Sequence, residues 1–234
     1  MDMRKYEEMN YISFKDFILD LQKEINSLTK KFPSLIDFLK RIEGVSILGN
    51  EVKLHWGRGN RVKFSSLLEL LDEWADDKVI VALDEAQELI NLRGTNLLFS
   101  FSYSFDNLRK VKIILTSSKM GLLYRYLKID DPDSPLHGRA MNRVELNPFD
   151  REKSKEFLER GFKEVGISFN EYDKIYEELG GVPGWQTYFG YYYQSRDYDK
   201  ALELTLHTAE KLIRKEFENF LKSRMIAKKR YITQ

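Results

Sequence analysis

The chain has 234 residues, enough to bury a sizeable core and to hold one domain plus a smaller one. Its 38 Lys and Arg residues balance 37 Asp and Glu residues, and the net charge of +1 gives no global field favouring nucleic acid or an acidic membrane surface. The lack of cysteine excludes disulfides and thiolate metal sites. The sequence contains no long apolar run and no signal-peptide core, so we expect a cytoplasmic protein without a membrane partner.

The first part of the chain predicts two helices and a hairpin. An apolar stripe predicts an amphipathic helix over 13–31, and Ser13 with Asp16 forms its capping box. A second helix is expected over 33–44, because it begins with proline and ends at glycine. Alternating apolar residues around a Gly-Asn turn then predict a β-hairpin over 45–56.

Strands and helices are expected to alternate in the next part of the chain. The elements are, in order, a helix over 67–74, a strand over 79–83, a helical stretch to 109, a strand over 111–115, a short helix over 120–128 and a strand over 143–146. Five consecutive apolar residues make up 79–83, which predicts a strand buried on both faces at the centre of a parallel sheet.

After residue 147 the pattern is helical to the end of the chain. The expected helices run from Asp150 to Gly166, then up to Gly180, then from Pro183, and finally from about 198 to 222. A region of alternating strands and helices followed by helices alone indicates an α/β layer with a helical lid. We therefore expect an α/β domain over 1–147 and a helical domain over 148–234.

Two adjacent carboxylates, Asp84 and Glu85, follow the strand over 79–83. Open α/β sheets bind their ligands at the carboxyl ends of the strands. An apolar strand that ends in two acids has the form of a Walker B element, in which the first acid holds Mg²⁺ and the second polarises the attacking water. The alternative is an ordinary helix start, since acids favour the positive end of the helix dipole.

Further candidate site residues are three hydroxyl residues after the next predicted strand and an arginine in the loop beyond it. Thr116, Ser117 and Ser118 come directly after the strand over 111–115, where a hydroxyl could position the lytic water or sense a γ-phosphate. The alternative is that they are ordinary loop residues. Arg139 is a candidate arginine finger that neutralises phosphate charge, and the alternative is a surface ion pair with the acids of 130–133.

Several segments together resemble a known family. In chain order they are VIVALDEAQELI (79–90), IILTSSKMGLLY (113–124), DDPDSPLHGR (130–139), NPFDREKSKEFLERGF (147–162) and GGVPGWQTYFG (180–190). They are similar to the archaeal ATPase family, a Walker-type family of the STAND-like AAA class, and the resemblance covers roughly residues 1–220. Two departures are visible: the strand tip reads TSSKMG where the family more often has a central glycine, and Gln186 replaces an expected apolar residue.

The resemblance implies a P-loop NTPase-like (ASCE) parallel sheet followed by an all-helical lid domain. It also implies ATP and Mg²⁺ as cofactors, with Asp84 as the metal ligand and Glu85, Arg139 and the three hydroxyl residues in catalysis. Gly181 and Pro183 match the family's GxP element, whose proline contacts the adenine. From the residues alone, this segment predicts a helix start with tight backbone packing.

No Walker A loop is found in the sequence. Gly44 and Gly49 have its glycine spacing, but Asn50 and Glu51 follow, and a carboxylate there would repel phosphate. The family places its P-loop unit ahead of the segment matched here, so we expect the chain to be incomplete at its N-terminus by about 50 residues, the size of one strand–loop–helix unit. We accordingly expect ATP hydrolysis by this chain to be weak or absent.

Three functions remain open at this point. The first is a nucleotide-dependent switch whose lid reports the state of bound ATP. The second is a non-catalytic, truncated paralogue that binds a protein partner or a second copy of itself through an exposed hydrophobic surface. The third is nucleic-acid binding through a C-terminal basic run, for which a solvated tail is the better explanation. This run comprises Lys222, Arg224, Lys228, Lys229 and Arg230.

Overall fold

The computed structural model describes residues 1–7, 9, 11–57 and 59–222. The chain divides into two compact units, Met1–Asn142 and Arg143–Gln234. Of the basic run, Arg224, Lys228, Lys229 and Arg230 lie outside the described residues, and the side chain of Lys222 is not described. No helix within the described ranges is both long and apolar enough to cross a membrane.

The first unit opens with the predicted helix and hairpin. Helix α1 (Phe14–Lys31) is capped by Ser13, whose hydroxyl accepts the backbone N–H of Asp16 at 3.1 Å, which confirms the predicted cap. Strands β2 (Val45–Leu48) and β3 (Glu51–Leu54) form the predicted antiparallel hairpin. The side chain of Asn26 joins hairpin to helix, because its amide bonds both the N–H and the C=O of Val52 at 2.8 Å.

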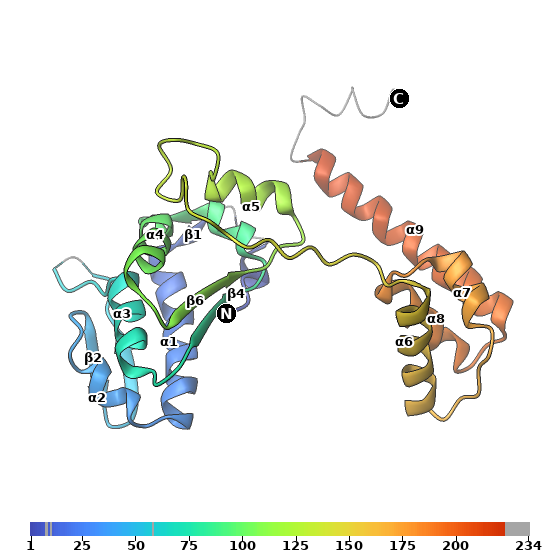
Figure 1. The fold of residues 1–234 in the computed structure, drawn as a ribbon, viewed down its shortest axis with the longest axis horizontal. Coiled ribbons are helices and arrows are strands. Elements are labelled where there is room, and N and C mark those ends of the chain that lie inside the picture. Colours follow the sequence, from blue (N-terminus) through green and yellow to red (C-terminus); the bar gives the residue numbers. More distant parts are fainter. Residues whose placement is uncertain (8, 10, 58, 223–234) are drawn as a thin grey trace. The chain divides into compact units, whose positions relative to one another are not determined.

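The centre of this unit is a pair of parallel strands, as predicted. Strands β4 (Val79–Leu83) and β6 (Val111–Leu115) lie side by side in register from one end to the other (Figure 1). Helix α3 (Phe64–Trp74) packs beside β6, and its Asp72 carboxylate accepts the backbone N–H groups of Lys110 and Val111 at 2.6 and 3.0 Å. Parallel strands with helical connections confirm the predicted α/β class.

The prediction that the 79–83 strand is buried on both faces is wrong. Leu83 is buried, but Ile80 is 62% exposed, and Ile114 on the neighbouring strand is 45% exposed. Both exposed side chains belong to one parallel pair, and no other strand joins that pair among the described residues. An apolar run makes a strand suitable for burial on both faces, but the burial itself requires other elements to cover both faces of the sheet.

Three further differences concern the ends and breaks of elements. The helical stretch expected up to 109 is interrupted: it consists of the 3₁₀ helix η2 (Ala86–Asn91), the short strand β5 (Leu92–Arg93) and helix α4 (Leu97–Asn107). Strand β5 pairs in parallel with β1 (Ile12–Ser13), which the sequence did not predict. Helix α2 (Leu35–Leu39) covers only part of 33–44.

The strand predicted over 143–146 is absent. The segment has no regular structure, and Val144 and Leu146 are 83% and 92% exposed. A strand needs a hydrogen-bonding neighbour and an apolar face to pack against, and these two side chains have neither burial nor a ladder. The apolar alternation of RVEL is therefore not sufficient to form a strand.

The second unit is helical, as predicted. It contains α6 (Arg151–Glu164), α7 (Tyr172–Leu179), α8 (Pro183–Tyr193) and α9 (Tyr198–Lys222). Asp150 caps α6 by accepting the N–H of Lys153 at 2.8 Å.

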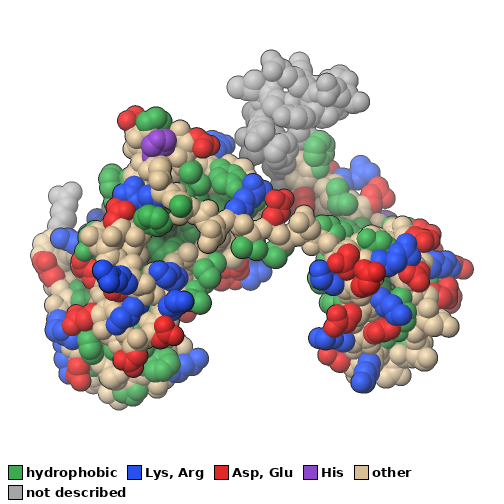
Figure 2. Space-filling model, in the orientation of Figure 1, with side chains coloured by type: hydrophobic (Ala, Val, Ile, Leu, Met, Phe, Trp, Pro, Cys, Tyr) green, Lys and Arg blue, Asp and Glu red, His purple; other side chains and the backbone are tan. Residues whose placement is uncertain are grey.

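The core of the second unit is aromatic: the rings of Phe162 and Phe169 stack with centroids 4.6 Å apart, and Phe189 packs edge-on to both. On the face shown in Figure 2, acidic and basic side chains are mixed over the surface of each unit.

Candidate functional site

The end of β4 is held in place by the first residues of the chain. The N–H of Met3 donates to the carbonyl of Asp84 at 2.9 Å, and the N–H of Asp84 donates to the carbonyl of Met1 at 3.0 Å. In the adjoining 3₁₀ helix η1 (Arg4–Tyr6), the guanidinium of Arg4 lies 3.9 Å from the Asp84 carboxylate. The Asp84 side chain remains 50% exposed, so a ligand can reach it.

Glu85 has a left-handed backbone, with φ 53° and ψ 46°. Such a conformation costs a non-glycine residue of order 1–3 kcal/mol and persists only where the surroundings impose it. Here the backbone on either side is fixed to the neighbouring strand: Ala86 donates to the carbonyl of Thr116 at 2.8 Å, and Thr116 donates to that of Leu83 at 3.0 Å. The strained turn directs the Glu85 side chain toward the tip of β6, where Ser118 bonds it.

The hydroxyl residues after β6 contact the acids after β4. Thr116 donates its hydroxyl proton to the Asp84 carboxylate and accepts the N–H of Glu85 at 3.3 Å. Ser118 donates both its N–H, at 3.1 Å, and its hydroxyl, at 2.7 Å, to Oε2 of Glu85. The structure therefore brings together four residues that the sequence singled out, from two segments of the chain. Ser117 instead donates to the amide oxygen of Gln87 at 2.6 Å.

The surroundings keep Glu85 ionised. Partial burial acts to raise the pKa of its carboxyl, but hydrogen bonds from Ser118 and Gln87, together with the positive charge of Lys119, bring the pKa below its usual value. For Glu88, burial is the larger effect and raises the pKa. A small cavity of about 50 Å³ adjoins this cluster, lined by Arg4, Glu7, Glu85, Gln87, Glu88 and Ser118.

The donor set suits Mg²⁺ held mainly by water and phosphate. Mg²⁺ prefers hard oxygen ligands and is commonly bound by one or two carboxylates, the remaining positions being filled by water and substrate phosphates. Asp84 and Thr116 supply a half-exposed carboxylate and a hydroxyl at one point. The described residues contain no cluster of three or more metal-binding side chains that would enclose an ion completely.

Arg139 is engaged elsewhere in the first unit. Its guanidinium forms a two-pronged ion pair with Asp106, at the end of α4, and also donates to the carbonyl of Pro135. None of these contacts involves Asp84 or Glu85. The arginine-finger role of Arg139 therefore stays a prediction.

Gly181 and Pro183 belong to the second unit, at the start of α8. The carbonyl of Gly181 accepts the N–H of Phe149 at 2.7 Å, and a Cβ on Gly181 would lie 1.7 Å from the Phe149 carbonyl oxygen. Pro183 occupies the first turn of α8, where its missing N–H leaves no helical bond unmade. These contacts account for tight packing and a helix start, and the adenine contact stays a prediction.

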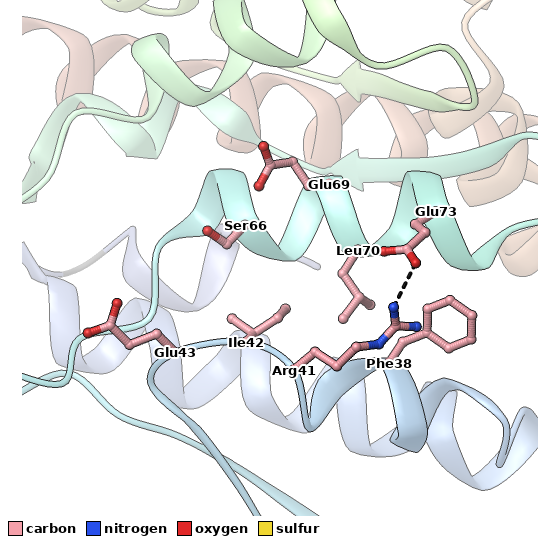
Figure 3. A pocket seen from close by; sticks show the side chains of 8 residues that line it. All are labelled: Phe38, Arg41, Ile42, Glu43, Ser66, Glu69, Leu70 and Glu73. Carbon is pink, nitrogen blue, oxygen red and sulfur yellow. Dashed lines mark hydrogen bonds and ion pairs between the residues drawn. The ribbon is translucent and has the colours of Figure 1, made fainter.

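A larger hollow of about 250 Å³ lies between α2 and α3 (Figure 3). Across it Arg41 pairs with Glu73 at 2.7 Å, and the guanidinium lies 4.3 Å from the ring centre of Phe38. None of the residues lining it belongs to β4, β6 or their tips. We therefore place the functional site at the strand ends.

Comparison with known proteins identifies the family of the chain. The profile of an ATPase domain found predominantly in Archaea matches residues 3–186. The chain belongs to this archaeal ATPase family. It is also similar to the solved structure of the Walker-type ATPase PABY2304 of Pyrococcus abyssi, with 34% identity and a TM-score of 0.74. That match covers 96% of this chain but 63% of the other, so the chain spans less than two thirds of its structural relative. No curated protein matches it.

Family membership does not single out two residues that the structure adds to the cluster, Gln87 and Arg4. Gln87 is 2% exposed and bonds both Glu85 and Ser117. A glutamine two residues after paired acids was a visible signal, but its burial depends on the 3₁₀ turn of η2, which the sequence suggested to be an ordinary helix.

Proposed function

We propose that this archaeal ATPase family member is a nucleotide-dependent switch that binds ATP with Mg²⁺ at the ends of β4 and β6. Asp84 holds the metal ion, and Glu85 orients the attacking water. Thr116, Ser117 and Ser118 position the lytic water through their hydrogen bonds to Asp84, Gln87 and Glu85. In this proposal the first unit is the ATPase core and the second is the lid domain, in which Gly181 and Pro183 are the residues for the adenine. Arg139 neutralises phosphate charge.

One observation carries the proposal: the acids after one parallel strand are hydrogen-bonded to the hydroxyls after the next. An ionised Glu85 whose orientation is fixed by Ser118 can accept a hydrogen bond from a water and direct its lone pair toward a phosphorus atom. The lowered pKa makes Glu85 a weak base, so its role is to orient the water rather than to hold its proton. Mg²⁺, when bound, supplies charge neutralisation of the phosphates.

We propose that this chain by itself hydrolyses ATP slowly. The sequence has no GxxxxGK[ST] segment, and so no Gly-rich backbone cradle or lysine for the β- and γ-phosphates. Charge-assisted hydrogen bonds contribute about 1.5–3 kcal/mol each, and losing the lysine alone would lower affinity about tenfold or more.

Calorimetric titration with ATP, in the presence and absence of Mg²⁺, tests the binding proposal. We expect weak binding that requires Mg²⁺ and is lost in Asp84→Asn. Single-turnover hydrolysis on the same protein tests the catalytic proposal, and Glu85→Gln should abolish any turnover without weakening binding. Binding that is independent of Mg²⁺, or turnover that Glu85→Gln leaves intact, would contradict the assigned roles.

A second candidate function is protein binding through the face of the parallel strand pair that carries Ile80 and Ile114. Both side chains are large, apolar and about half exposed or more, in a position where strands are usually covered. If a partner or a second copy covers this face, Ile80→Asp should reduce association without reducing the stability of the isolated chain. Sedimentation velocity at increasing protein concentration tests whether a second copy of the chain binds this face.

A further inference from the structure

Gln87 is a buried amide that connects the two strand ends of the candidate site. It lies in η2, two residues after Glu85, and is 2% exposed. Its Nε2 donates to Oε2 of Glu85 at 2.7 Å, while its Oε1 accepts the hydroxyl proton of Ser117 at 2.6 Å. One side chain thus joins the acid after β4 to the polar tip of β6.

The orientation of this amide is determined by the chemistry of its neighbours. An ionised carboxylate only accepts hydrogen bonds, so the amide nitrogen and not the oxygen must face Glu85. The second proton of Nε2 points toward Oε1 of Glu88, 3.5 Å away, which also accepts. The amide oxygen is then left to Ser117. Exchanging the nitrogen and oxygen of Gln87 would bring its oxygen against the charge of Glu85.

Gln87 therefore helps determine which carboxylate oxygen of Glu85 is free to accept a further hydrogen bond. Oε2 receives three donors: Nε2 of Gln87, and the N–H and hydroxyl of Ser118. Within the described part of the chain, no hydrogen bond is formed by Oε1 of Glu85. Oε1 is thus the oxygen that can accept from a water.

We infer that Gln87 is a positioning residue, which holds the Glu85 carboxylate in one rotamer so that Oε1 faces the attacking water. The inference rests on the proposed role of Glu85 but not on how fast this chain hydrolyses ATP. It also gives Ser117 a role distinct from that of Ser118: Ser117 holds Gln87, whereas Ser118 holds Glu85 directly.

The direct test needs no nucleotide. The Glu85 carboxyl is followed by ¹³C NMR from pH 2.5 to 8, its signal being identified by its loss in Glu85→Gln. We expect Gln87→Leu to raise the pKa of Glu85 by about one unit, the equivalent of one hydrogen bond to a charged group. Gln87→Glu should raise it further, because a second carboxylate would face the first. The charged groups around Glu85 (Arg4, Glu7, Asp84, Glu88 and Lys119) are unchanged in both variants.

Asn26→Leu is the matched control. It also removes a two-bond side-chain amide from the first unit, between α1 and β3, and should leave the pKa of Glu85 unchanged. An unchanged pKa in folded Gln87→Leu would overturn the inference. If Gln87→Leu does not fold, Ser117→Ala replaces it: losing the bond that holds Gln87 should still raise the pKa, and no change would equally overturn the inference.

Turnover provides a second readout that separates positioning from general instability. Where ATP hydrolysis is measurable, Gln87→Leu should lower the single-turnover rate at least tenfold while ATP affinity stays within twofold. Equal losses of affinity and rate would contradict a positioning role. If ATP does not bind even to the unaltered chain, the proposed function fails, but the pKa shift still tests the contact between Gln87 and Glu85.

Discussion

Ser118 donates its backbone N–H and its hydroxyl to the same carboxylate oxygen of Glu85, at 3.1 and 2.7 Å. The first residue follows β6 and the second follows β4, so the pair connects the carboxyl ends of two parallel strands. This double contact fixes a carboxylate that a left-handed backbone has already directed to the sheet edge. The site is thus assembled by two adjacent strands, with the first residues of the chain beside Asp84.

The Ser118 hydroxyl should contribute to stability only while Glu85 is ionised. The folded-state pKa of Glu85 lies below its usual value of 4.5, so this contribution is complete above that pH and is lost as pH falls through the folded pKa. We expect Ser118→Ala to lower the free energy of unfolding by about 0.5–1 kcal/mol at pH 7, because solvent weakens the bond. Urea unfolding at pH 7 and pH 3 measures the effect, and a deficit of the same size at both would contradict it.

Gly181→Ala should disrupt the start of α8. A Cβ would lie 1.7 Å from the carbonyl oxygen of Phe149, and the clash is with backbone that cannot rotate away. We expect a loss of about 3 kcal/mol or more in the free energy of unfolding of the second unit. Gly190→Ala lies within α8, where no atom outside the helix's own backbone is within 4 Å of the added methyl; it is the control and should stabilise by up to about 1 kcal/mol. Similar effects of the two changes would contradict this account.

Local chemistry made much of the fold predictable. The Ser13 and Asp150 caps, the Gly-Asn turn and the apolar strands over 79–83 and 111–115 each express a preference of a few neighbouring residues. Such preferences act over short stretches, so they survive in the folded chain.

What the sequence did not predict depends on distant neighbours. The exposure of Ile80 is determined by whether a layer covers that face, and the missing strand over 143–146 by the lack of a ladder partner. At the site, the acids and hydroxyls were predictable from their places after strands. The bridging role of Gln87 was not, since it requires a 3₁₀ turn next to a left-handed residue.

Gln186, which departs from the family's expected apolar residue, should contribute to the stability of the second unit. It is fully buried, and its Nε2 donates to the hydroxyl of Ser154 at 2.5 Å and to the carbonyl of Gly180 at 2.7 Å. Gln186→Leu would leave the buried Ser154 hydroxyl without this donor, but it would also remove the Oε1 of Gln186, which is buried without a hydrogen-bond partner among the described residues, so the net cost should be about 1 kcal/mol. Gln194→Leu at the exposed end of α8 should cost less than 0.5 kcal/mol. Chemical denaturation compares them, and equal costs would show that the buried amide bonds contribute nothing.

Arg139 and Asp106 should behave as one structural unit in the absence of nucleotide. We expect the ion pair between them to be the main contribution of each residue to stability. Arg139→Gln and Asp106→Asn should then lower the melting temperature by similar small amounts, and the double variant should lower it no further than either single variant. With ATP the two should diverge: losing the arginine weakens binding, whereas Asp106→Asn releases the arginine and does not. Equal effects of both variants on ATP affinity would remove Arg139 from the proposed site.

The central claim is that nucleotide and metal bind where the ends of β4 and β6 meet. Mn²⁺, added in place of Mg²⁺ together with ATP, broadens the NMR signals of backbone amides near it. The account predicts selective broadening of residues 84–87 and 116–118, and its loss in Asp84→Asn. Broadening centred elsewhere in the chain, or a pattern that Asp84→Asn leaves unchanged, would contradict it.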